Sequence, residues 1–208
     1  MVSLPRDTDV VVVGGGPAGL AAAIAARQQG LDVVLADRAA PPIDKACGEG
    51  LMPDGIAALR QLGVDLPLAR GAPFRGIRFI DKNRSAEASF LHRQGRGMRR
   101  PELQQLLLER AQAIGVRCVW QREVEALGAN TVTIGSHAVR YRFVVGADGL
   151  QSKLRRWSDI QPAGPGSQRV GLRRHFRIGR WTDSSKSIGS TTAKPMSHRS
   201  RPTKYAWR

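Results

Sequence analysis

Asp9-Val-Val-Val-Val-Gly-Gly-Gly-Pro-Ala-Gly19 is the stretch of this 208-residue sequence that decides the fold. Val10–Val13 form an apolar run that is typical of a buried parallel strand. Gly14, Gly16 and Gly19 then have the G-x-G-x-x-G spacing. In that pattern the first glycine allows a tight turn, the second lets a pyrophosphate approach the backbone, and the third lets helix and strand pack closely. The stretch therefore predicts a strand, a phosphate-binding turn and the start of a helix.

The residues that follow complete a β-α-β unit. The Ala-rich segment Leu20–Gln29 predicts a helix whose N-terminus offers free N–H groups and a positive dipole to a phosphate. Gly30 ends this helix, and Val33–Leu35 predict a second strand with Asp37 at its end. A carboxylate at that position can accept hydrogen bonds from ribose hydroxyls. The order of these elements favours a dinucleotide-binding fold over a glycine-rich turn in another kind of α/β protein.

Length and composition restrict the class of protein. A chain of 208 residues can hold one large domain, or one domain and part of another. Its two cysteines, Cys47 and Cys118, are too few for a disulfide framework and fit a reducing cytoplasm, where we expect the protein. The apolar run over 10–26 contains four glycines and a proline and follows two aspartates. We therefore interpret it as the dinucleotide fold and expect no integral membrane segment.

The net charge of +16 raises the possibility of a nucleic-acid partner. The segment Ser184–Arg208 contains six basic residues and no acidic one. The other basic side chains are mostly arginines, and they are scattered along the chain with few aromatic residues among them. Nucleic-acid sites combine a basic groove with aromatic side chains on which bases stack. We therefore expect no nucleic-acid partner.

A second strand-and-turn pattern lies at Val144-Val-Gly-Ala-Asp-Gly149, followed by Ser152 and Arg155. Here the sequence resembles the FAD-dependent monooxygenases and reductases of the para-hydroxybenzoate-hydroxylase-like group, whose G-A-D-G-x-x-S-x-x-R motif matches residues 146 to 155. The resemblance implies that Asp148 binds the ribityl chain of FAD, since a carboxylate accepts hydrogen bonds from hydroxyl groups. An ordinary strand-to-helix turn would explain this motif alone, but not its occurrence after the first one.

A third pattern is Arg99-Arg-Pro-Glu-Leu103, at the start of a predicted helix. The family that the sequence resembles carries an arginine three residues ahead of a leucine here, near the FAD phosphates. Arg100 matches that position, and Arg99 is its neighbour. An arginine can hold a phosphate through two parallel hydrogen bonds. A solvated arginine pair at a helix start is the alternative interpretation.

The segment Cys47-Gly-Glu-Gly-Leu-Met-Pro53 resembles a C-G-E-G-L-x-P segment of the geranylgeranyl-reductase-like and halogenase-like branches of the same superfamily. The resemblance implies that Cys47 and Gly48 lie beside the isoalloxazine ring of FAD. The alternative is a glycine-rich loop whose cysteine is merely small and buried. Cys47 is also a candidate for a catalytic thiol. Glu49 and His175 are further candidates for proton transfer, and both can equally be structural.

These motifs and the resemblance together predict FAD as the cofactor, NADH or NADPH as the transient electron donor, a small apolar or aromatic substrate and no metal. The expected protein is an FAD-dependent oxidoreductase that either activates oxygen for hydroxylation or halogenation, or reduces a C=C bond. The flavin supplies the chemistry, and the protein holds and tunes it. The oligomeric state is not predicted. The predicted cofactor-binding residues are Gly14, Gly16, Pro17, Ala18, Gly19, Asp37, Arg38, Cys47, Gly48, Arg100, Val124, Asp148 and Gly149.

The predicted fold class is α/β: a Rossmann-like FAD-binding domain with a central parallel sheet, a small three-stranded antiparallel meander, and the start of a β-rich substrate domain. The FAD-binding domain spans 1–160, with 73–95 on a substrate-side sheet; 161–168 is a linker that includes the Pro- and Gly-rich stretch 161–167, and 169–183 begins the substrate domain. The predicted helices are 20–29, 53–62, 101–114 and 151–157. The predicted strands are 10–13, 33–35, 74–80, 86–91, 116–119, 124–127, 131–134, 138–141, 143–146 and 170–178.

The last 25 residues, 184–208, differ in character from the rest of the chain. They contain six serines, no acid and no periodic pattern, which predicts a disordered tail. Codons can also be chosen for them that encode an acid-containing, strand-like peptide when read one base earlier, so we expect an out-of-frame segment. The family's third FAD motif, similar to G-D-A-A-H, has no match in the 208 residues. The alternative function is therefore a non-catalytic fragment of such an enzyme, and a protein that binds only NAD is a third.

Overall fold

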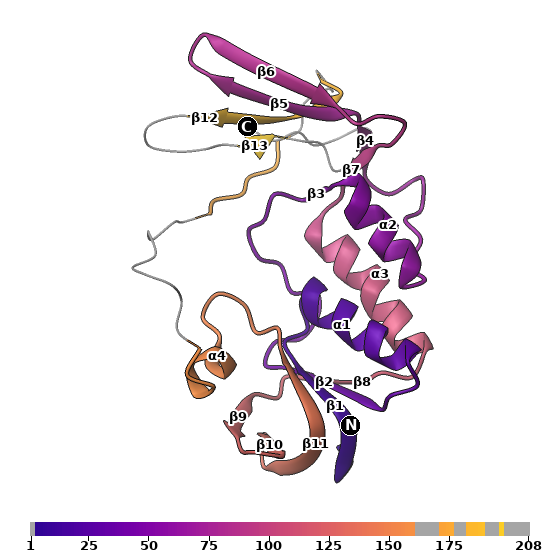
Figure 1. The fold of residues 1–208 in the computed structure, drawn as a ribbon, viewed down its shortest axis with the longest axis vertical. Coiled ribbons are helices and arrows are strands. Elements are labelled where there is room, and N and C mark those ends of the chain that lie inside the picture. Colours follow the sequence, from indigo (N-terminus) through magenta and orange to yellow (C-terminus); the bar gives the residue numbers. More distant parts are fainter. Residues whose placement is uncertain (1–2, 161–170, 177–181, 190–195, 198–208) are drawn as a thin grey trace. The chain divides into compact units, whose positions relative to one another are not determined.

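The computed structural model describes residues 3–160, 171–176, 182–189 and 196–197 (Figure 1). The chain forms two compact units, and each is built from two separate chain segments. Residues 1–43 and 103–169 make the first unit, and residues 44–102 and 170–208 make the second. This division differs from the predicted one, which kept most of 44–102 in the first domain and set apart only 73–95.

The first unit contains a six-stranded sheet in the order β8-β2-β1-β11-β10-β9. The first four of these strands are parallel neighbours, and the last two continue the sheet in antiparallel fashion. The predicted α/β class, with a central parallel sheet and an antiparallel meander, is confirmed. The strands are β1 (Asp7–Val13), β2 (Val33–Asp37), β8 (Arg117–Trp120), β9 (Val124–Leu127), β10 (Thr131–Ile134) and β11 (His137–Gly146).

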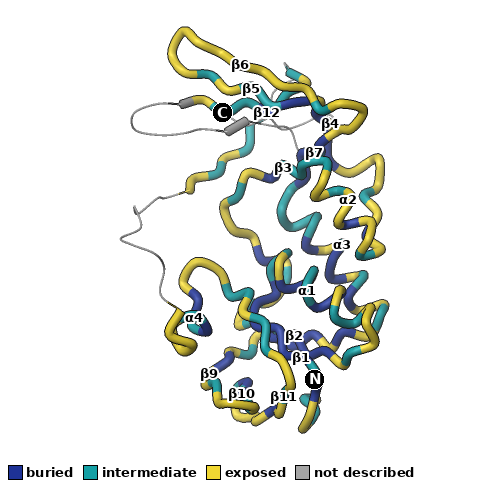
Figure 2. Tube along the Cα trace, viewed as in Figure 1, coloured by how far each residue is buried: buried dark blue, intermediate teal, exposed yellow. Residues whose placement is uncertain are grey.

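Helices cover this sheet because their apolar residues recur at helical spacing. In α1 (Pro17–Gln28) the buried residues include Leu20, Ala23 and Ile24, which lie on one face. In α3 (Arg100–Ala113) the buried positions 104, 107, 108 and 111 follow the same period. Figure 2 shows the dark blue of buried residues concentrated on β1, β2 and the inner turns of these helices. Burial on both faces explains the unbroken valine run of β1.

The meander and the returning strand of the parallel sheet form one continuous element, β11. Two strands had been predicted here, 138–141 and 143–146, and their separation is wrong. The first half of β11 pairs with β10 in antiparallel fashion, from His137 to Arg140. On its other edge, residues from Arg140 to Gly146 pair in parallel with β1. Because the two partners use opposite edges of the same strand, the chain needs no turn between them.

Within the described residues, the second unit contains two small sheets and the helix α2. One sheet has the order β3-β7-β4, and the other has the order β13-β12-β5-β6. The elements are β3 (Gly50–Leu51), α2 (Pro53–Gln61), β4 (Ala72–Phe74), β5 (Gly76–Asp81), β6 (Arg84–Ser89), β7 (Gly95–Gly97), β12 (Ser184–Gly189) and β13 (Met196–Ser197). The remaining helix, α4 (Lys153–Trp157), belongs to the first unit.

Three predictions about this unit need correction. The single strand predicted over 74–80 is divided into β4 and β5, because the chain passes from one sheet to the other at Arg75. The backbone N–H of Arg75 donates to the Asp183 carbonyl, and the Arg75 carbonyl accepts the backbone N–H of Phe90. The tail predicted as disordered forms a strand over Ser184–Gly189, paired in parallel with β5 at every residue. Of the strand predicted over 170–178, residues 171–175 are irregular.

Part of the predicted organisation lies outside the described residues. This holds for the linker at 161–168, for 170 and 177–178 of the last predicted strand and for most of the segment after residue 189.

Candidate functional site

The glycine turn after β1 is built so tightly that side chains have no room in it. Gly14 has a φ of +111°, and a Cβ added there would lie 2.3 Å from the Ala147 carbonyl oxygen. A Cβ at Gly19 would lie 1.8 Å from the Gly14 carbonyl oxygen. The first glycine therefore makes the turn and the third brings α1 against it, as the G-x-G-x-x-G spacing predicts.

The N-terminus of α1 presents backbone donors without a competing acceptor from its own residues. Gly16 is the N-cap residue, and no side chain caps the helix there. Pro17 follows in the first turn, which contains no acidic residue, and Ala18 is exposed. The first N–H groups of a helix have no partner within the helix, and the helix dipole favours an anion beside them. This end of α1 can therefore bind a phosphate.

Asp37 fixes the glycine turn as well as ending β2. Its carboxylate accepts the backbone N–H of Gly15 at 2.6 Å and that of Ala39 at 2.8 Å. The Trp120 ring, at the end of β8, covers Gly15 so closely that a Cβ there would lie 2.1 Å from it. A carboxylate oxygen can accept more than one hydrogen bond, so Asp37 keeps capacity for a ribose hydroxyl.

The second motif lies directly beside the first at the carboxyl ends of neighbouring parallel strands. The Ala147 backbone N–H donates to the Val13 carbonyl at 2.8 Å, and the Asp148 nitrogen is 2.9 Å from where a Gly14 Cβ would be. The structure therefore brings together the two turns, which lie more than 120 residues apart in the sequence. Ligands of open α/β sheets bind at this edge.

One oxygen of the Asp148 carboxylate is used by the protein and the other is not. Oδ2 accepts the backbone N–H of Lys153 at 2.7 Å and that of Leu154 at 3.3 Å, at the start of α4. Oδ1 is buried and, among the described residues, has no hydrogen-bond partner. A buried polar atom without a partner is costly, so Oδ1 is suited to a ligand that donates a hydrogen bond.

The surroundings of Asp148 favour its ionised form. Burial acts to raise the pKa of this carboxyl, but hydrogen bonding by the Ser152 hydroxyl and the backbone N–H groups of Leu154 and Lys153 outweighs it and holds the pKa below its usual range. A carboxylate is a stronger acceptor for hydroxyl groups than a carboxylic acid. Asp148 therefore has both the position and the charge for the role that the resemblance implies.

The other predicted residues of the first unit lie at the edges of this region. Gly149 is exposed, has a φ of +84° and accepts the Ser152 N–H through its carbonyl. Arg38 is exposed directly after β2. Val124 is the first residue of β9, and its side chain is part of the hydrophobic core, so only its backbone is suited to face a ligand.

Cys47, Gly48 and Arg100 belong to the second unit, where they flank a buried carboxylate. Cys47 is half-buried and has no disulfide partner. Gly48 is exposed. Glu49, with φ +54°, has a fully buried side chain whose Oε1 accepts the backbone N–H of Arg100 at 3.2 Å. Arg99, next to Arg100, has a buried Nε without a partner among the described residues.

An arginine and a histidine complete the surroundings of Glu49. Arg173 donates from Nη1 to Oε1 of Glu49 at 2.7 Å, and its Nη2 is paired with Asp44 at 2.5 Å. His175 Nε2 lies 3.1 Å from Oε2 of Glu49. The hydrogen bond that Arg173 donates to Asp44, together with the charges of Glu49 and Asp44, raises the pKa of Arg173. Glu49 and His175, predicted as possible proton carriers, are thus held together in one ion-pair cluster.

Sequence patterns did not reveal the partners that hold these groups in place. Gln104 is buried in α3, donates to the Gly15 carbonyl at 2.7 Å and accepts the Ile43 N–H at 2.5 Å. The one sequence signal for Gln104 was that this polar residue occupies a position where the helical period predicts an apolar side chain. Trp120 and Asp44 carried no such signal, because their contacts depend on the tertiary fold.

Comparison with known proteins places this geometry in a family. The sequence profile of the FAD-binding domain family matches residues 7–174. This range includes both turns and every member of the Glu49 cluster except His175. The chain belongs to this FAD-binding family. Its members among the relatives are FAD-dependent oxidoreductases, as the sequence resemblance predicted.

Individual relatives agree with this assignment. Menaquinone reductase from Mycobacterium tuberculosis is 34% identical over 179 residues, covering 75% of this chain and 42% of that protein. Digeranylgeranylglycerophospholipid reductase 1 from Methanopyrus kandleri is 31% identical over 172 residues, covering 74% and 43%. The chain thus spans less than half the length of these relatives. PqsL from Pseudomonas aeruginosa, in complex with 2-aminobenzoylacetate, has the same fold, with a TM-score of 0.76 at 20% identity over 96% of this chain and 59% of that chain.

The residues present fit FAD. The glycine turn leaves backbone where a Cβ would collide, the α1 N-terminus offers donors to a phosphate, and Asp148 Oδ1 is a buried acceptor that lacks a donor among the described residues. These features suit a pyrophosphate flanked by hydroxyl-bearing groups. None of the helices in the described part of the chain is long and apolar enough to cross a membrane.

Proposed function

We propose that this chain provides the cofactor-holding part of an FAD-dependent oxidoreductase that takes hydride from NADH or NADPH. The single observation that carries the proposal is the buried Oδ1 of Asp148, which lacks a donor from the described residues although it lies beside the glycine turn. The ribityl chain of FAD carries several hydroxyl groups that can donate to this oxygen, and the resemblance at residues 146 to 155 is to FAD-dependent enzymes. FAD therefore accounts for it better than NAD alone does.

Each residue of the first unit has a defined task in this proposal. The backbone of Gly16 and the first turn of α1 bind the pyrophosphate through N–H groups and the helix dipole. Asp37 accepts from the adenosine ribose while it holds Gly15. Asp148 accepts from the ribityl hydroxyls and stays ionised because its pKa is lowered. Gln104 and Trp120 keep the turn in place.

Residues of the second unit have proposed tasks of their own. Arg99 and Arg100 bind phosphate oxygens, which would satisfy the buried Nε of Arg99. Cys47 and Gly48 lie beside the flavin ring, and Glu49 fixes their loop through Arg173. Bound FAD would accept hydride from the nicotinamide and pass the electrons to oxygen or to the substrate.

The substrate in this proposal is a small apolar or aromatic molecule. The relatives include reductases and monooxygenases by name, so the proposed reaction is either reduction of an unsaturated apolar substrate or hydroxylation. The aromatic ligand of PqsL supports the same chemical class. A non-catalytic fragment is the second candidate, because the chain spans less than half of those relatives.

Anaerobic reduction of bound flavin tests the proposal and separates these two candidates. The purified chain is loaded with FAD, freed of excess cofactor, and mixed with NADH or NADPH while absorbance at 450 nm is followed. The enzyme hypothesis predicts bleaching at a rate well above that of free FAD. A chain that retains no flavin, or bound flavin that bleaches no faster than free FAD, would contradict the enzyme hypothesis and support the fragment.

A further inference from the structure

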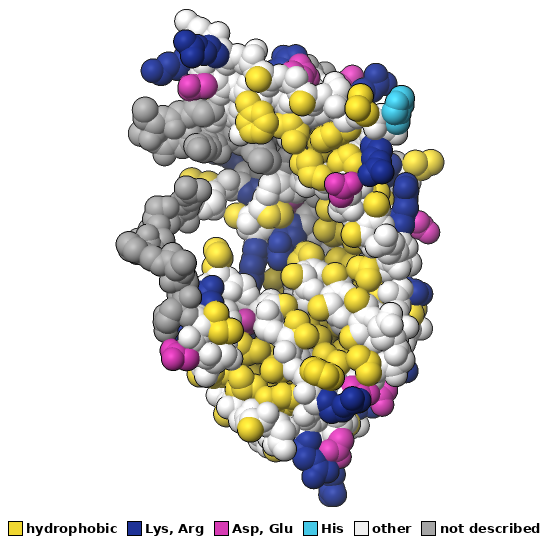
Figure 3. Space-filling view, viewed as in Figure 1, with side chains coloured by type: hydrophobic (Ala, Val, Ile, Leu, Met, Phe, Trp, Pro, Cys, Tyr) yellow, Lys and Arg dark blue, Asp and Glu magenta, His cyan; other side chains and the backbone are white. Residues whose placement is uncertain are grey.

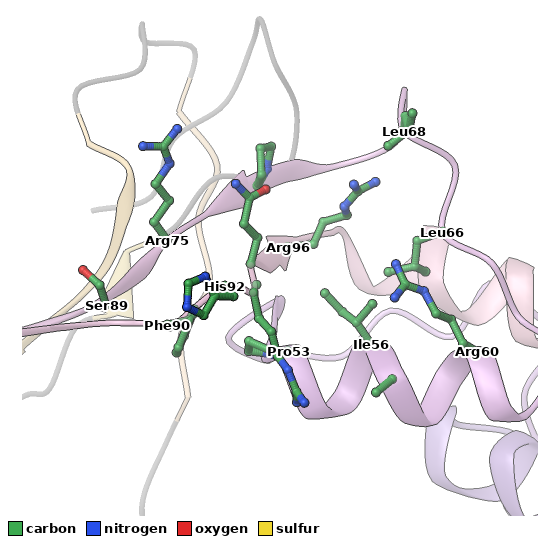
Figure 4. Close-up of a pocket in the computed structure, with 15 residues that line it drawn as sticks. Pro53, Ile56, Arg60, Leu66, Leu68, Arg75, Ser89, Phe90, His92 and Arg96 are labelled. Carbon is green, nitrogen blue, oxygen red and sulfur yellow. The ribbon is translucent and has the colours of Figure 1, made fainter.

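The second unit contains a cavity of about 780 Å³ that no predicted cofactor residue lines (Figure 4). Its walls come from α2, from the loop that follows α2, from Pro73 and Arg75 at the end of β4, and from the segment between the end of β6 and β7. Ile56 and Leu66 make part of its wall apolar, and Arg60, Arg75 and Arg96 make it basic. Figure 4 shows Arg60 and Arg96 reaching toward the side where Leu66 lies. We call this cavity the basic pocket.

The basic pocket has unbalanced positive charge. No acidic side chain is among its described lining residues. Arg93 is paired with Asp54 at 2.9 Å, but Arg60 and Arg75 make no ion pair within the described part of the chain. Arg96 donates hydrogen bonds from Nη1 to the backbone carbonyls of Pro67 and Arg70, in the loop after α2. Guanidinium groups held without an anion attract phosphate groups.

Two large apolar side chains project beside these cations. Leu68 lines the pocket and is 89% exposed. Leu91 is 83% exposed and lies between Phe90 and His92, which both line the pocket. Figure 3 shows hydrophobic side chains mixed with Lys and Arg over the α2 region. Exposed leucines beside arginines are typical of surfaces that enter the boundary between lipid headgroups and acyl chains.

We propose that the basic pocket, with Leu68 and Leu91, binds a membrane surface that contains anionic phospholipids. The arginines bind headgroup phosphates, and the two leucines enter the acyl boundary. A free phosphate would account for the arginines but not for the exposed leucines. The charge complementarity therefore favours a membrane over a soluble anion. This inference goes beyond the proposed function and does not rest on it, because it needs no flavin.

Vesicle sedimentation of the full 208-residue chain tests the proposal. Vesicles of phosphatidylglycerol and phosphatidylcholine are compared with pure phosphatidylcholine at physiological salt. Because the chain carries a net charge of +16, charge alone will produce some binding, and the variants must separate the two effects. Leu68→Ser with Leu91→Ser leaves the charge unchanged. Arg60→Gln with Arg75→Gln removes two charges from the pocket, and Arg117→Gln with Arg156→Gln removes two exposed charges from the first unit.

We expect each pocket double variant to weaken binding to anionic vesicles by at least about tenfold, and the Arg117 and Arg156 variant to weaken it much less. Unchanged binding after loss of the two leucines, or equal loss in the Arg117 and Arg156 variant, would overturn the proposal in favour of diffuse attraction. Release of the chain by millimolar inorganic phosphate, but not by the same ionic strength of chloride, would overturn it in favour of a free-phosphate site.

Discussion

Gly19 sets the distance between α1 and the end of β1. A methyl group added at this residue would lie 1.8 Å from the Gly14 carbonyl oxygen, so the obstacle is backbone and not a flexible side chain. We predict that Gly19→Ala destabilises the fold by about 1–3 kcal/mol or more, because the helix must move away from the strand. Urea unfolding measures this change.

Gly55→Ala is the matched control for this substitution. Gly55 lies inside α2, and a Cβ there meets nothing within 4 Å. Alanine should therefore stabilise the helix by about 0.5–1 kcal/mol. Equal destabilisation by the two substitutions would contradict the packing role of Gly19.

The two cysteines differ in burial, and their reactivity should differ accordingly. Burial raises the pKa of the Cys118 thiol to about 11, so little thiolate forms at neutral pH. Cys47 is half-buried. We predict that an excess of a thiol reagent modifies Cys47 in the native protein and Cys118 only after denaturation. Mass spectrometry of the peptides identifies the site, and rapid native modification of Cys118 would contradict the buried position.

Asp148 should make stability depend on pH in a defined direction. Its pKa is lowered in the folded chain, so the carboxylate stabilises the fold above the pKa of the unfolded chain, and this contribution is lost as pH falls through the folded pKa. Asp148→Asn lacks it at every pH. We predict that wild type is more stable than the variant at pH 7 and that the difference shrinks as the pH is lowered from neutral through the acidic range, as measured by urea unfolding. A difference that grows on acidification would contradict the sign.

At the scale of elements, the loop from Asp44 to Glu49 is held by side chains instead of by a strand. Glu49 connects it to the start of α3 through Arg100 N–H, and to the segment 171–176 through Arg173. This explains why residues 171–175 are irregular although their sequence predicted a strand. Their charged side chains are engaged with the loop, and alternation alone does not distinguish this arrangement from a sheet.

Removal of Glu49 should destabilise the second unit strongly. Glu49→Ala leaves Arg173 and His175 without their shared carboxylate, and breaking a buried pair costs about 3–5 kcal/mol. Glu123→Gln is the control, since its pair with Lys153 is exposed and should contribute far less. Urea unfolding of both variants checks the contrast. A small effect of Glu49→Ala would mean that the cluster does not hold the loop.

The sequence predicted the position of an element where its residue pattern had a single, local cause. The valine run and the glycine spacing predicted β1, the turn and α1 because each residue there has a local reason, although β1 and α1 each begin three residues earlier than predicted. Residues 138–146 were divided in the prediction because two pairing partners on opposite edges leave no local signal of continuity. The strand at Ser184–Gly189 was missed for a related reason, since its serine-rich sequence has weak strand propensity and only the neighbouring β5 orders it.

At the scale of the whole molecule, the motifs and the resemblance predicted candidate cofactor residues but not the residues that support them. Asp37 and Asp148 were predicted because their motifs fix their strand ends. Gln104 and Trp120 lie far along the chain from the turn they hold, so only the tertiary fold brings them to Gly15. The chain is also divided into units at 43/44, directly after Pro41 and Pro42, and at 102/103, which lies inside α3 and has no boundary signal in the sequence.

The affinity for FAD, measured by quenching of flavin fluorescence during titration with the chain, tests the central claim most directly. The account predicts binding at one FAD per chain, and weakening by roughly 10- to 100-fold in Asp148→Asn, because a hydrogen bond to a charged group contributes about 1.5–3 kcal/mol. ADP should bind with similar affinity to wild type and variant, since it has no ribityl chain. Wild-type affinity of Asp148→Asn for FAD, or equal losses for FAD and ADP, would contradict the account.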